Sequence, residues 1–329
     1  MSVPQISDLV KKSFQQYKPQ NFGDVKDLFH FVQGTSGERT KRILELDRQR
    51  LAKTKVQGQG SAKAKVAEGY YKDIERKTVS ITRVLTGENK DDITAHGLGK
   101  WATEVKDDVV GKAELDMTNL FGYASGTSYT DNGGFAIDTT TGDGKSFANN
   151  AHTLKHSSAT YSNIVSGAPA LSEAGLEVAN DMFVYNTKDN YGQRIVYRAN
   201  ALLITRNTRM QNRADRILGS SAPEKIEGTA NANSGVKNSW KNRFTVKTIE
   251  FDLTAKEEYD ANKKYYWAIA SIGNDPATTL QAYFVSWKKA YPAPPEIDQD
   301  KFVISFTARA LYGIGVVSGR GIAFSFATS

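Results

Sequence analysis

The stretch that comes closest to a known chemical motif is Gly142-Asp-Gly-Lys-Ser146. Its Gly-Lys-Ser ending is the one found in phosphate-binding loops. Such a loop also needs a glycine five residues before its second glycine, and Thr139 stands there. No apolar strand leads into the segment, and no convincing helix starts at Phe147. The segment therefore predicts a turn and no nucleotide site.

The histidines are the next candidates for chemistry. His152 and His156 are four residues apart, which on a helix would aim two imidazoles at one metal ion. They lie in a segment rich in Ser, Asn and Thr, with no third ligand close in sequence. The chain has no cysteine, which excludes disulfides and thiolate sites, and it has no G-x-S-x-G or H-E-x-x-H motif. We expect no metal, no cofactor and no catalysis. An enzyme that uses an Asp/Glu pair leaves weak local signatures and stays an alternative.

Positive charge is concentrated near the start of the chain. Residues 1–86 contain 17 Lys and Arg against 9 Asp and Glu, whereas the rest contains 26 against 27. Between positions 48 and 67 there is no acid at all, and the basic residues there are Arg48, Arg50, Lys53, Lys55, Lys63 and Lys65. A basic segment of this kind fits nucleic acid, an acidic neighbouring subunit or simply a solvated surface.

The spacing within this basic segment favours contact with another chain. Its lysines alternate on both sides of Gly58-Gln59-Gly60, so a hairpin turning there would place all four lysines on one face. Apart from Val56 and Val66 it has little to bury, and an isolated hairpin is marginal in water. We expect this hairpin to be flexible or ordered by another chain, and we predict that its six basic residues make inter-subunit contacts.

The remaining pattern indicates an α+β chain without repeats. Asp91–Tyr123 predicts a long amphipathic helix, whose packed face includes Ile93, Leu98, Trp101, Val105 and Val109. Shorter helices are expected at Asp24–Val32, Ser172–Phe183 (N-cap Ser172) and Thr208–Leu218 (N-cap Asn207). Residues 124–168 are polar and predict short hairpins or a loop that clasps a partner. Strands are expected at Thr78–Val84, Ile195–Thr205, Phe244–Leu253, Lys264–Ile272, Leu280–Lys288, Phe302–Ala308 and Ile322–Phe326.

Four short runs in the middle of the chain resemble a known family. They are Asp143-Gly-Lys-Ser-Phe147, His152-Thr-Leu154, Ser162-Asn-Ile-Val-Ser-Gly-Ala168 and Leu171-Ser-Glu-Ala-Gly-Leu176. Together they are similar to the major head subunits of Mu-like phages, within the tailed-bacteriophage major capsid proteins of the Hong Kong 97 type. The likeness is close over about residues 130–210. Elsewhere it lies only in the order of the elements.

This resemblance implies a domain plan and a structural function. Such subunits assemble as pentamers and hexamers into an icosahedral shell that encloses double-stranded DNA without sequence-specific contact. The implied partners are further copies of the chain, a separate scaffolding protein, a portal and a decoration protein. The place of action would be the virion, assembled in the bacterial cytoplasm. The domains would be an N-terminal arm (1–45), an extended loop (46–87), a peripheral domain with a long spine helix (88–183 and 302–329) and an axial domain (184–301).

Three alternatives remain at this stage. One is an encapsulin-type compartment, which has the same fold but encloses protein. Another is a basic nucleic-acid-binding protein, which the aromatic clusters at Tyr70-Tyr71 and Tyr265-Tyr266-Trp267 would suit. The third is an enzyme. The sequence shows no apolar run of membrane-spanning length and no secretory signal, so neither a membrane nor export is expected.

Overall fold

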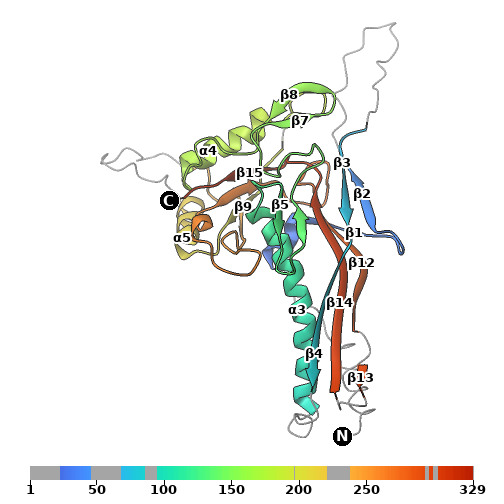
Figure 1. The fold of residues 1–329 in the computed structure, drawn as a ribbon. Coiled ribbons are helices and arrows are strands. Elements are labelled where there is room, and N and C mark those ends of the chain that lie inside the picture. The colour runs from blue at the N-terminus through green and yellow to red at the C-terminus, as the bar shows by residue number, and fades with distance from the viewer. Residues whose placement is uncertain are drawn as a thin grey trace.

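The computed structural model describes residues 23–45, 68–85, 95–195, 197–220, 238–292, 296–298 and 303–328. A long helix and a long sheet run side by side and project from a broader body, which contains a second sheet (Figure 1). Helices are interspersed among strands that pair mainly antiparallel, which confirms the α+β class expected from the sequence.

The projection is built on one five-stranded sheet. β14 lies at its centre, antiparallel to β12, β13 and β4, and β1 adds to the far side of β12 in parallel. Its strands are β1 (Phe29–Gln33), β4 (Lys77–Leu85), β12 (Ala282–Pro292), β13 (Glu296–Asp298) and β14 (Val303–Val316). The clean apolar–polar alternation of Thr78–Val84 therefore does mark a strand, β4.

Helix α3 (Ala95–Gly122) packs along β14 and β4. Its 28 residues make it about 42 Å long at 1.5 Å per residue. Val105 and Val109 are buried against Ala308, with Ile81 and Ala310 at the edge of the cluster. Further along, the helix enters the main core, where it buries Met117, Leu120 and Phe121.

The body is built on a second sheet, three of whose four strands are buried on both faces. β9 (Ala201–Ile204) pairs in parallel with β10 (Thr245–Thr248) and antiparallel with β11 (Trp267–Ala270), which in turn pairs with β15 (Ile322–Ser325). Alternate residues face opposite layers: Leu203 and Phe324 join the α3 core, while Leu202 and Trp267 join a second core. The second core is completed by α4 (Glu173–Asp181) and α5 (Thr208–Gly219).

Both short helices begin at the predicted caps. The hydroxyl oxygen of Ser172 accepts a hydrogen bond from the Gly175 amide at 3.1 Å, and the side chain of Asn207 accepts one from the Arg209 amide at 2.9 Å. Each cap satisfies an amide that the first turn of the helix leaves without an intrahelical partner. A π-helical turn, Met182–Asn186, continues α4.

The strands predicted at Ile195–Thr205 and Phe244–Leu253 are shorter in the structure, as β9 and β10, and two further predicted elements differ more. The helix expected over Asp24–Val32 is only a 3-10 turn (η1, Asp24–Leu28), and β1 follows, because pairing with β12 overrides the local helical pattern. The strand expected to end at Ala308 continues to Val316 through two glycines. A side chain at Gly313 would collide with the Glu75 carbonyl of the crossing strand, so glycine is what lets β14 pass beneath it.

The polar segment 124–168 forms short hairpins, one of the two outcomes expected for it. β5 (Ser128–Thr130) pairs with β6 (Ala136–Asp138), and β7 (His152–Leu154) pairs with β8 (Ser157–Tyr161). A further hairpin, β2 (Thr40–Leu44) with β3 (Tyr71–Glu75), brackets residues 46–67. A last short 3-10 turn, η3, covers Ala261–Lys263.

Sheet membership does not follow the predicted domain boundaries. β12 falls within the predicted axial segment, 184–301, yet it pairs with β14 in the long sheet. β15 falls within the predicted peripheral segment, 302–329, yet it pairs with β11 in the body. The last third of the chain therefore contributes strands to both sheets.

Candidate assembly surface

The residues singled out from the sequence form two sets: six basic residues predicted to contact other subunits, and five apolar residues predicted to form the packed face of the long helix. The six basic residues at 48, 50, 53, 55, 63 and 65 lie outside the described ranges, as does Ile93. Leu98 and Trp101 lie within α3, where only their backbone is described. Val105 and Val109 are buried inside the subunit, so they serve its own packing.

The hairpin β2–β3 carries the chain toward and away from the basic segment. Arg42 on β2 makes a two-pronged ion pair with Asp73 on β3, with both N···O distances at 2.7 Å. The guanidinium also lies 4.0 Å from the centre of the Tyr71 ring. The hydrogen bonds from Arg42 lower the pKa of Asp73. This pair is exposed, so it contributes at most about 1 kcal/mol to stability.

An acidic groove lies between β4, α3 and the turn that joins β5 to β6. Its volume is about 740 Å³, and apolar side chains of β4 form part of its wall. Four carboxylates line the groove and define it: Asp107, Asp108, Asp131 and Glu257. One lysine, Lys112, also lines it. Phe135, which is 70% exposed, stands at its edge.

Two of these carboxylates are paired with cations and two are not. Asp108 accepts a hydrogen bond from Arg83 at 2.9 Å, and Asp131 lies 3.4 Å from Lys112. Among the described residues no cation is paired with Asp107 or Glu257, and one carboxylate oxygen of Asp107 is buried without a hydrogen bond. Burial, reinforced by neighbouring Asp108, raises the pKa of Asp107. A cation brought into the groove would relieve this unfavourable burial.

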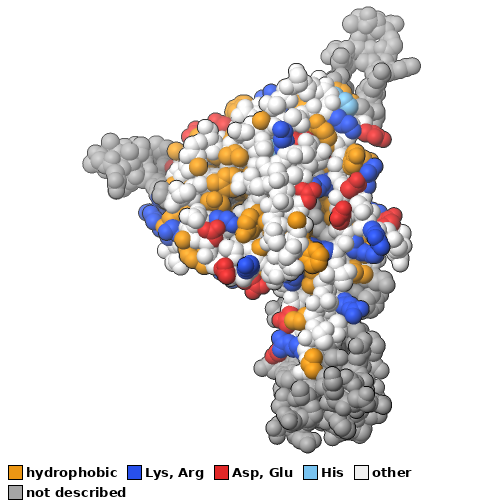
Figure 2. Space-filling model, viewed as in Figure 1, with side chains coloured by type: hydrophobic (Ala, Val, Ile, Leu, Met, Phe, Trp, Pro, Cys, Tyr) orange, Lys and Arg blue, Asp and Glu red, His pale blue; other side chains and the backbone are white. Residues whose placement is uncertain are grey.

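On the face in Figure 2 basic and acidic side chains are interspersed, without a broad field of one sign. Exposed large apolar side chains are scattered over several elements, and the most exposed after Phe135 are Tyr259, Tyr185 and Val84. Scattered apolar side chains are normal on a protein surface.

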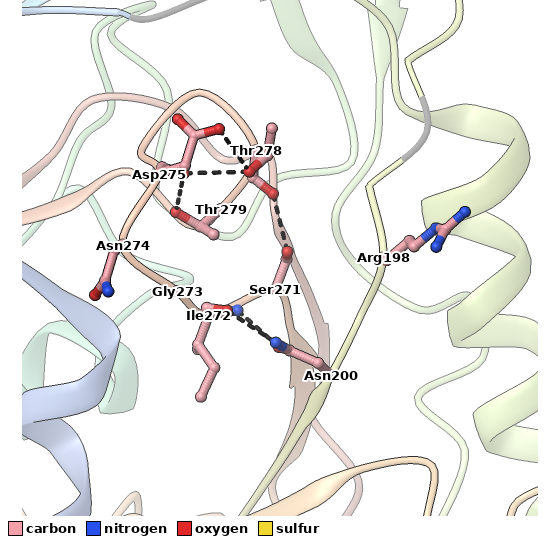
Figure 3. Close-up of a pocket in the computed structure, with 9 residues that line it drawn as sticks. All are labelled: Arg198, Asn200, Ser271, Ile272, Gly273, Asn274, Asp275, Thr278 and Thr279. Atoms are coloured by element: carbon pink, nitrogen blue, oxygen red, sulfur yellow. Dashed lines mark hydrogen bonds between the residues drawn. The ribbon is translucent and has the colours of Figure 1, made fainter.

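A polar hollow of about 530 Å³ lies where the loop between β11 and β12 approaches the start of β9 (Figure 3). Its polar groups largely bond one another: Asn200 is bonded to the Ile272 backbone in both directions, and Thr278 and Thr279 donate to Asp275. Arg198 points away from this loop in Figure 3. The arrangement closes the loop and gathers no set of groups that could carry out catalysis.

The Gly142–Ser146 segment forms a tight turn, as the sequence predicts. The Thr141 amide donates to the Lys145 carbonyl at 2.8 Å, and Gly144 has a φ of +76°, the left-handed conformation that favours glycine. Instead of facing a phosphate, the Lys145 amide donates to the Asp143 carboxylate at 3.1 Å.

We therefore expect this turn to bind no nucleotide. Isothermal titration calorimetry should detect no micromolar ATP affinity in the parent protein or in Lys145→Ala. Micromolar binding in the parent that disappears in the variant would contradict this expectation.

The histidine spacing does not describe a metal site. His152 lies on β7 and is fully buried, with Nδ1 3.0 Å from Asp143 and Nε2 3.3 Å from the Phe147 carbonyl. His156 lies in the turn after β7, with Nε2 3.1 Å from the Glu68 carbonyl. Within the described part of the chain no three His, Asp or Glu side chains gather as metal ligands would, and no helix is long and apolar enough to span a membrane.

The bonds around Asp143 predict a loss of stability in acid. Burial alone would raise the pKa of Asp143, but hydrogen bonds from His152 and Thr141 outweigh it and lower the pKa to about 2. An aspartate with a lowered pKa in the folded state stabilises the fold above its unfolded pKa, about 4. That contribution is lost as the pH falls toward 2.

Asp143→Asn tests this prediction. The variant should be about 1.5–3 kcal/mol less stable than the parent at pH 7, because its amide is a weaker acceptor than a carboxylate. The difference should narrow between pH 4 and pH 2 in thermal melts. Asp181→Asn, at an exposed position on α4, is the control and should show no such narrowing. A constant difference across that range would contradict the assignment.

Comparison with known proteins rests on structure alone. No protein-family model matches the chain, and no curated protein is similar to it in sequence. Three solved structures illustrate the structural likeness. A structure titled as the capsid of an empty GTA particle has a TM-score of 0.51 and 12% identity, and the match covers 94% of this chain and 91% of that one. The capsid structure of cyanophage P-SCSP1u has a TM-score of 0.51 at 9% identity, covering 94% and 90%. The cyanophage Pam1 capsid subunit has a TM-score of 0.50 at 10% identity, covering 94% and 93%.

These matches span both sheets and α3, so the likeness concerns the whole architecture and not one motif. At such low identity it establishes the fold and no individual residue's function. The chain has the fold of phage and GTA capsid proteins, as its resemblance to the Hong Kong 97 type leads one to expect.

Proposed function

We propose that this protein is the major capsid subunit of a tailed phage or a related particle, and that it assembles as pentamers and hexamers into an icosahedral shell around double-stranded DNA. The observation that carries the proposal is the likeness to capsid subunits over 94% of the chain at a TM-score of 0.51. Its action would be structural and non-enzymatic, in the virion, after assembly in the host cytoplasm.

The shape of the subunit supports this proposal. α3 and the long sheet form a projection that extends from the body, a shape that a compact monomer would not need (Figure 1). In the proposed domain plan, residues 88–183, with α3 as spine helix, and residues 302–329 are peripheral, and residues 184–301 are axial. Residues 1–45 form the N-terminal arm and 46–87 the extended loop. Scaffolding, portal and decoration proteins remain expected partners.

We further propose that the basic segment of one subunit lies against the acidic groove of its neighbour. The segment contributes lysines at four positions, and the groove contributes Asp107 and Glu257, which have no cation partner among the described residues. Each exposed pair is worth only about 0.2–1 kcal/mol, but the contact repeats at every subunit of a closed shell. Such contacts weaken as salt rises.

Sedimentation of the purified protein tests the proposal at its coarsest level. A shell subunit should sediment as particles of megadalton mass, alone or with a scaffolding protein from the same genome. A chain that stays monomeric under both conditions, across a range of salt and protein concentration, would speak against it.

The contents of the particles distinguish the proposed capsid from two alternatives, an encapsulin-type compartment and a nucleic-acid-binding protein. An encapsulin-type compartment would copurify with a cargo protein and exclude DNA. A nucleic-acid-binding protein would bind DNA without forming closed particles. Nuclease treatment followed by protein and DNA analysis of the particle fraction distinguishes these outcomes.

A further inference from the structure

A buried charge pair lies where residues 46–67 leave the described part of the chain. Arg320 donates from Nη1 to the Glu45 carboxylate at 2.5 Å, across 275 positions of sequence. Both side chains are almost fully buried, at 1% and 3% exposure. Glu45 is the last described residue before the segment 46–67, and Glu68 is the first after it.

The same carboxylate also holds the returning strand. Its second oxygen accepts a hydrogen bond from the Tyr70 amide at 3.2 Å and another from the Asn190 side chain at 2.7 Å. The backbone amide of Glu45 donates to the Tyr70 carbonyl at 2.7 Å, and Arg320 reaches the Asn190 side-chain oxygen at 3.2 Å. Three distant parts of the chain thus meet on one carboxylate. We call Glu45, Asn190 and Arg320 the stem clamp.

A second set of contacts fixes the backbone just outside the stem clamp. Lys155 donates to the Gly69 carbonyl at 2.7 Å, and the His156 ring nitrogen lies 3.1 Å from the Glu68 carbonyl. A side chain at Gly69 would lie 3.0 Å from Glu45 Cβ, closer than such atoms normally approach. The chain before the segment, at Glu45, and the chain after it, at residues 68–70, are therefore held directly against each other, and we call them the two stems.

Stability alone does not account for a charge pair at this depth. The desolvation of two buried charges roughly cancels their attraction, and well-packed apolar residues of similar volume often serve as well. An ion pair with several hydrogen bonds adds geometric specificity, because it admits only one arrangement of the groups that it joins. The groups joined here are the two stems of the segment that carries the basic residues.

We infer that the stem clamp is a positioning device for assembly: it fixes where residues 46–67 leave and rejoin the subunit body. Arg320 is its central positioning residue. This inference rests on the proposed function, since the position of the segment matters only if the segment contacts another subunit.

The decisive variant removes both charges and keeps the fold. Glu45→Gln with Arg320→Met leaves a side-chain oxygen for Tyr70 and Asn190 to bond, and leaves no buried charge without a partner. Its melting temperature should stay within a few degrees of the parent. Its yield of shells should fall at least ten-fold, and amide hydrogen exchange at residues 44–45 and 68–71 should be at least ten-fold faster. The matched control is Arg206→Met with Glu250→Gln, an exposed pair at 2.8 Å, which should change neither readout.

The outcomes separate the clamp from the proposed function. If the parent forms shells and the double variant forms them equally well, the clamp is only a packing feature and the inference fails while the function stands. If the parent forms no shells, the function fails, and unchanged exchange in the double variant would overturn the clamp as well. Should the double variant not fold, Arg320→Lys keeps the charge but cannot bond Glu45 and Asn190 through two separate guanidinium nitrogens. A ten-fold loss of shells in that variant supports the clamp, and a parent-like yield overturns it.

Discussion

Reversing the charge of the four hairpin lysines (Lys53, Lys55, Lys63 and Lys65 to glutamate) is expected to abolish shell assembly while leaving the subunit folded. The segment has little apolar surface to bury, so reversing its charge should not alter the circular dichroism or the melting temperature of the subunit. In a shell each subunit would instead bring four negative charges to the acidic groove of its neighbour. Electron microscopy and sedimentation should show free subunits, or particles that form only at raised salt, where the repulsion is screened.

A compensating change in the acidic groove provides the control. Asp107→Asn with Glu257→Lys makes the groove less negative by three charges, and neither side chain is paired with a cation among the described residues. It should partly restore assembly of the four-glutamate variant and weaken assembly of the parent. If the four-glutamate variant alone forms stable, DNA-filled particles, the basic segment is a solvated surface. If it forms particles that lack DNA, the segment acts on DNA and not on a neighbour.

Asp116→Ala is expected to destabilise the subunit by about 3–5 kcal/mol, the usual cost of leaving a buried charge without its partner. Asp116 is fully buried on α3 and joins three elements. It pairs with Lys77 of β4 at 2.8 Å and with Lys112 at 2.7 Å, and it accepts the Tyr312 hydroxyl of β14 at 2.6 Å. Its loss would leave the Lys77 ammonium and the Tyr312 hydroxyl without this acceptor, and Lys112 with only Asp131, 3.4 Å away.

The pH dependence of this variant provides an independent check. Burial lowers the pKa of Lys77 although Asp116 opposes it, so the folded state favours the neutral amine more than the unfolded state does. The penalty for burying the charged lysine is therefore full at neutral pH and relieved as the pH approaches 10. The deficit of Asp116→Ala in denaturant titrations should shrink over that range. Asp108→Ala, on the exposed side of the same helix, should cost less than about 1 kcal/mol. A similarly small cost for Asp116→Ala would show that the buried network is not needed for stability.

Local signals predicted the elements whose structure is decided locally. Ser172 and Asn207 cap helices because a side-chain oxygen placed just before a helical segment satisfies a free amide wherever the segment lies in the fold. The alternation in Thr78–Val84 marks a strand because one of its faces packs on α3. The turn at Gly142–Ser146 was also predicted from its sequence, and the hydrogen bonds that form it lie within residues 141–145.

The parts that sequence reasoning missed depend on distant partners. Phe29–Gln33 becomes a strand only because residues 282–286 lie beside it, about 250 positions away. Neither the Asp116 network nor the Glu45–Arg320 pair has a local signature, since isolated Asp, Glu and Arg residues usually predict a solvated surface. The acidic groove is likewise assembled from four separate segments. Gly313 is a partial exception: a glycine inside a strand pattern signals close approach of another backbone, and β3 does cross there.

Cryo-electron microscopy of the protein expressed alone, and with its neighbouring genes, tests the central claim most directly. The account predicts closed particles whose reconstruction has icosahedral symmetry, with this subunit arranged in rings of five and six. Within them the residues 48–65 of one subunit should lie against Asp107 and Glu257 of the next. Protein that remains monomeric, or that coats DNA without closing into shells, would contradict the account.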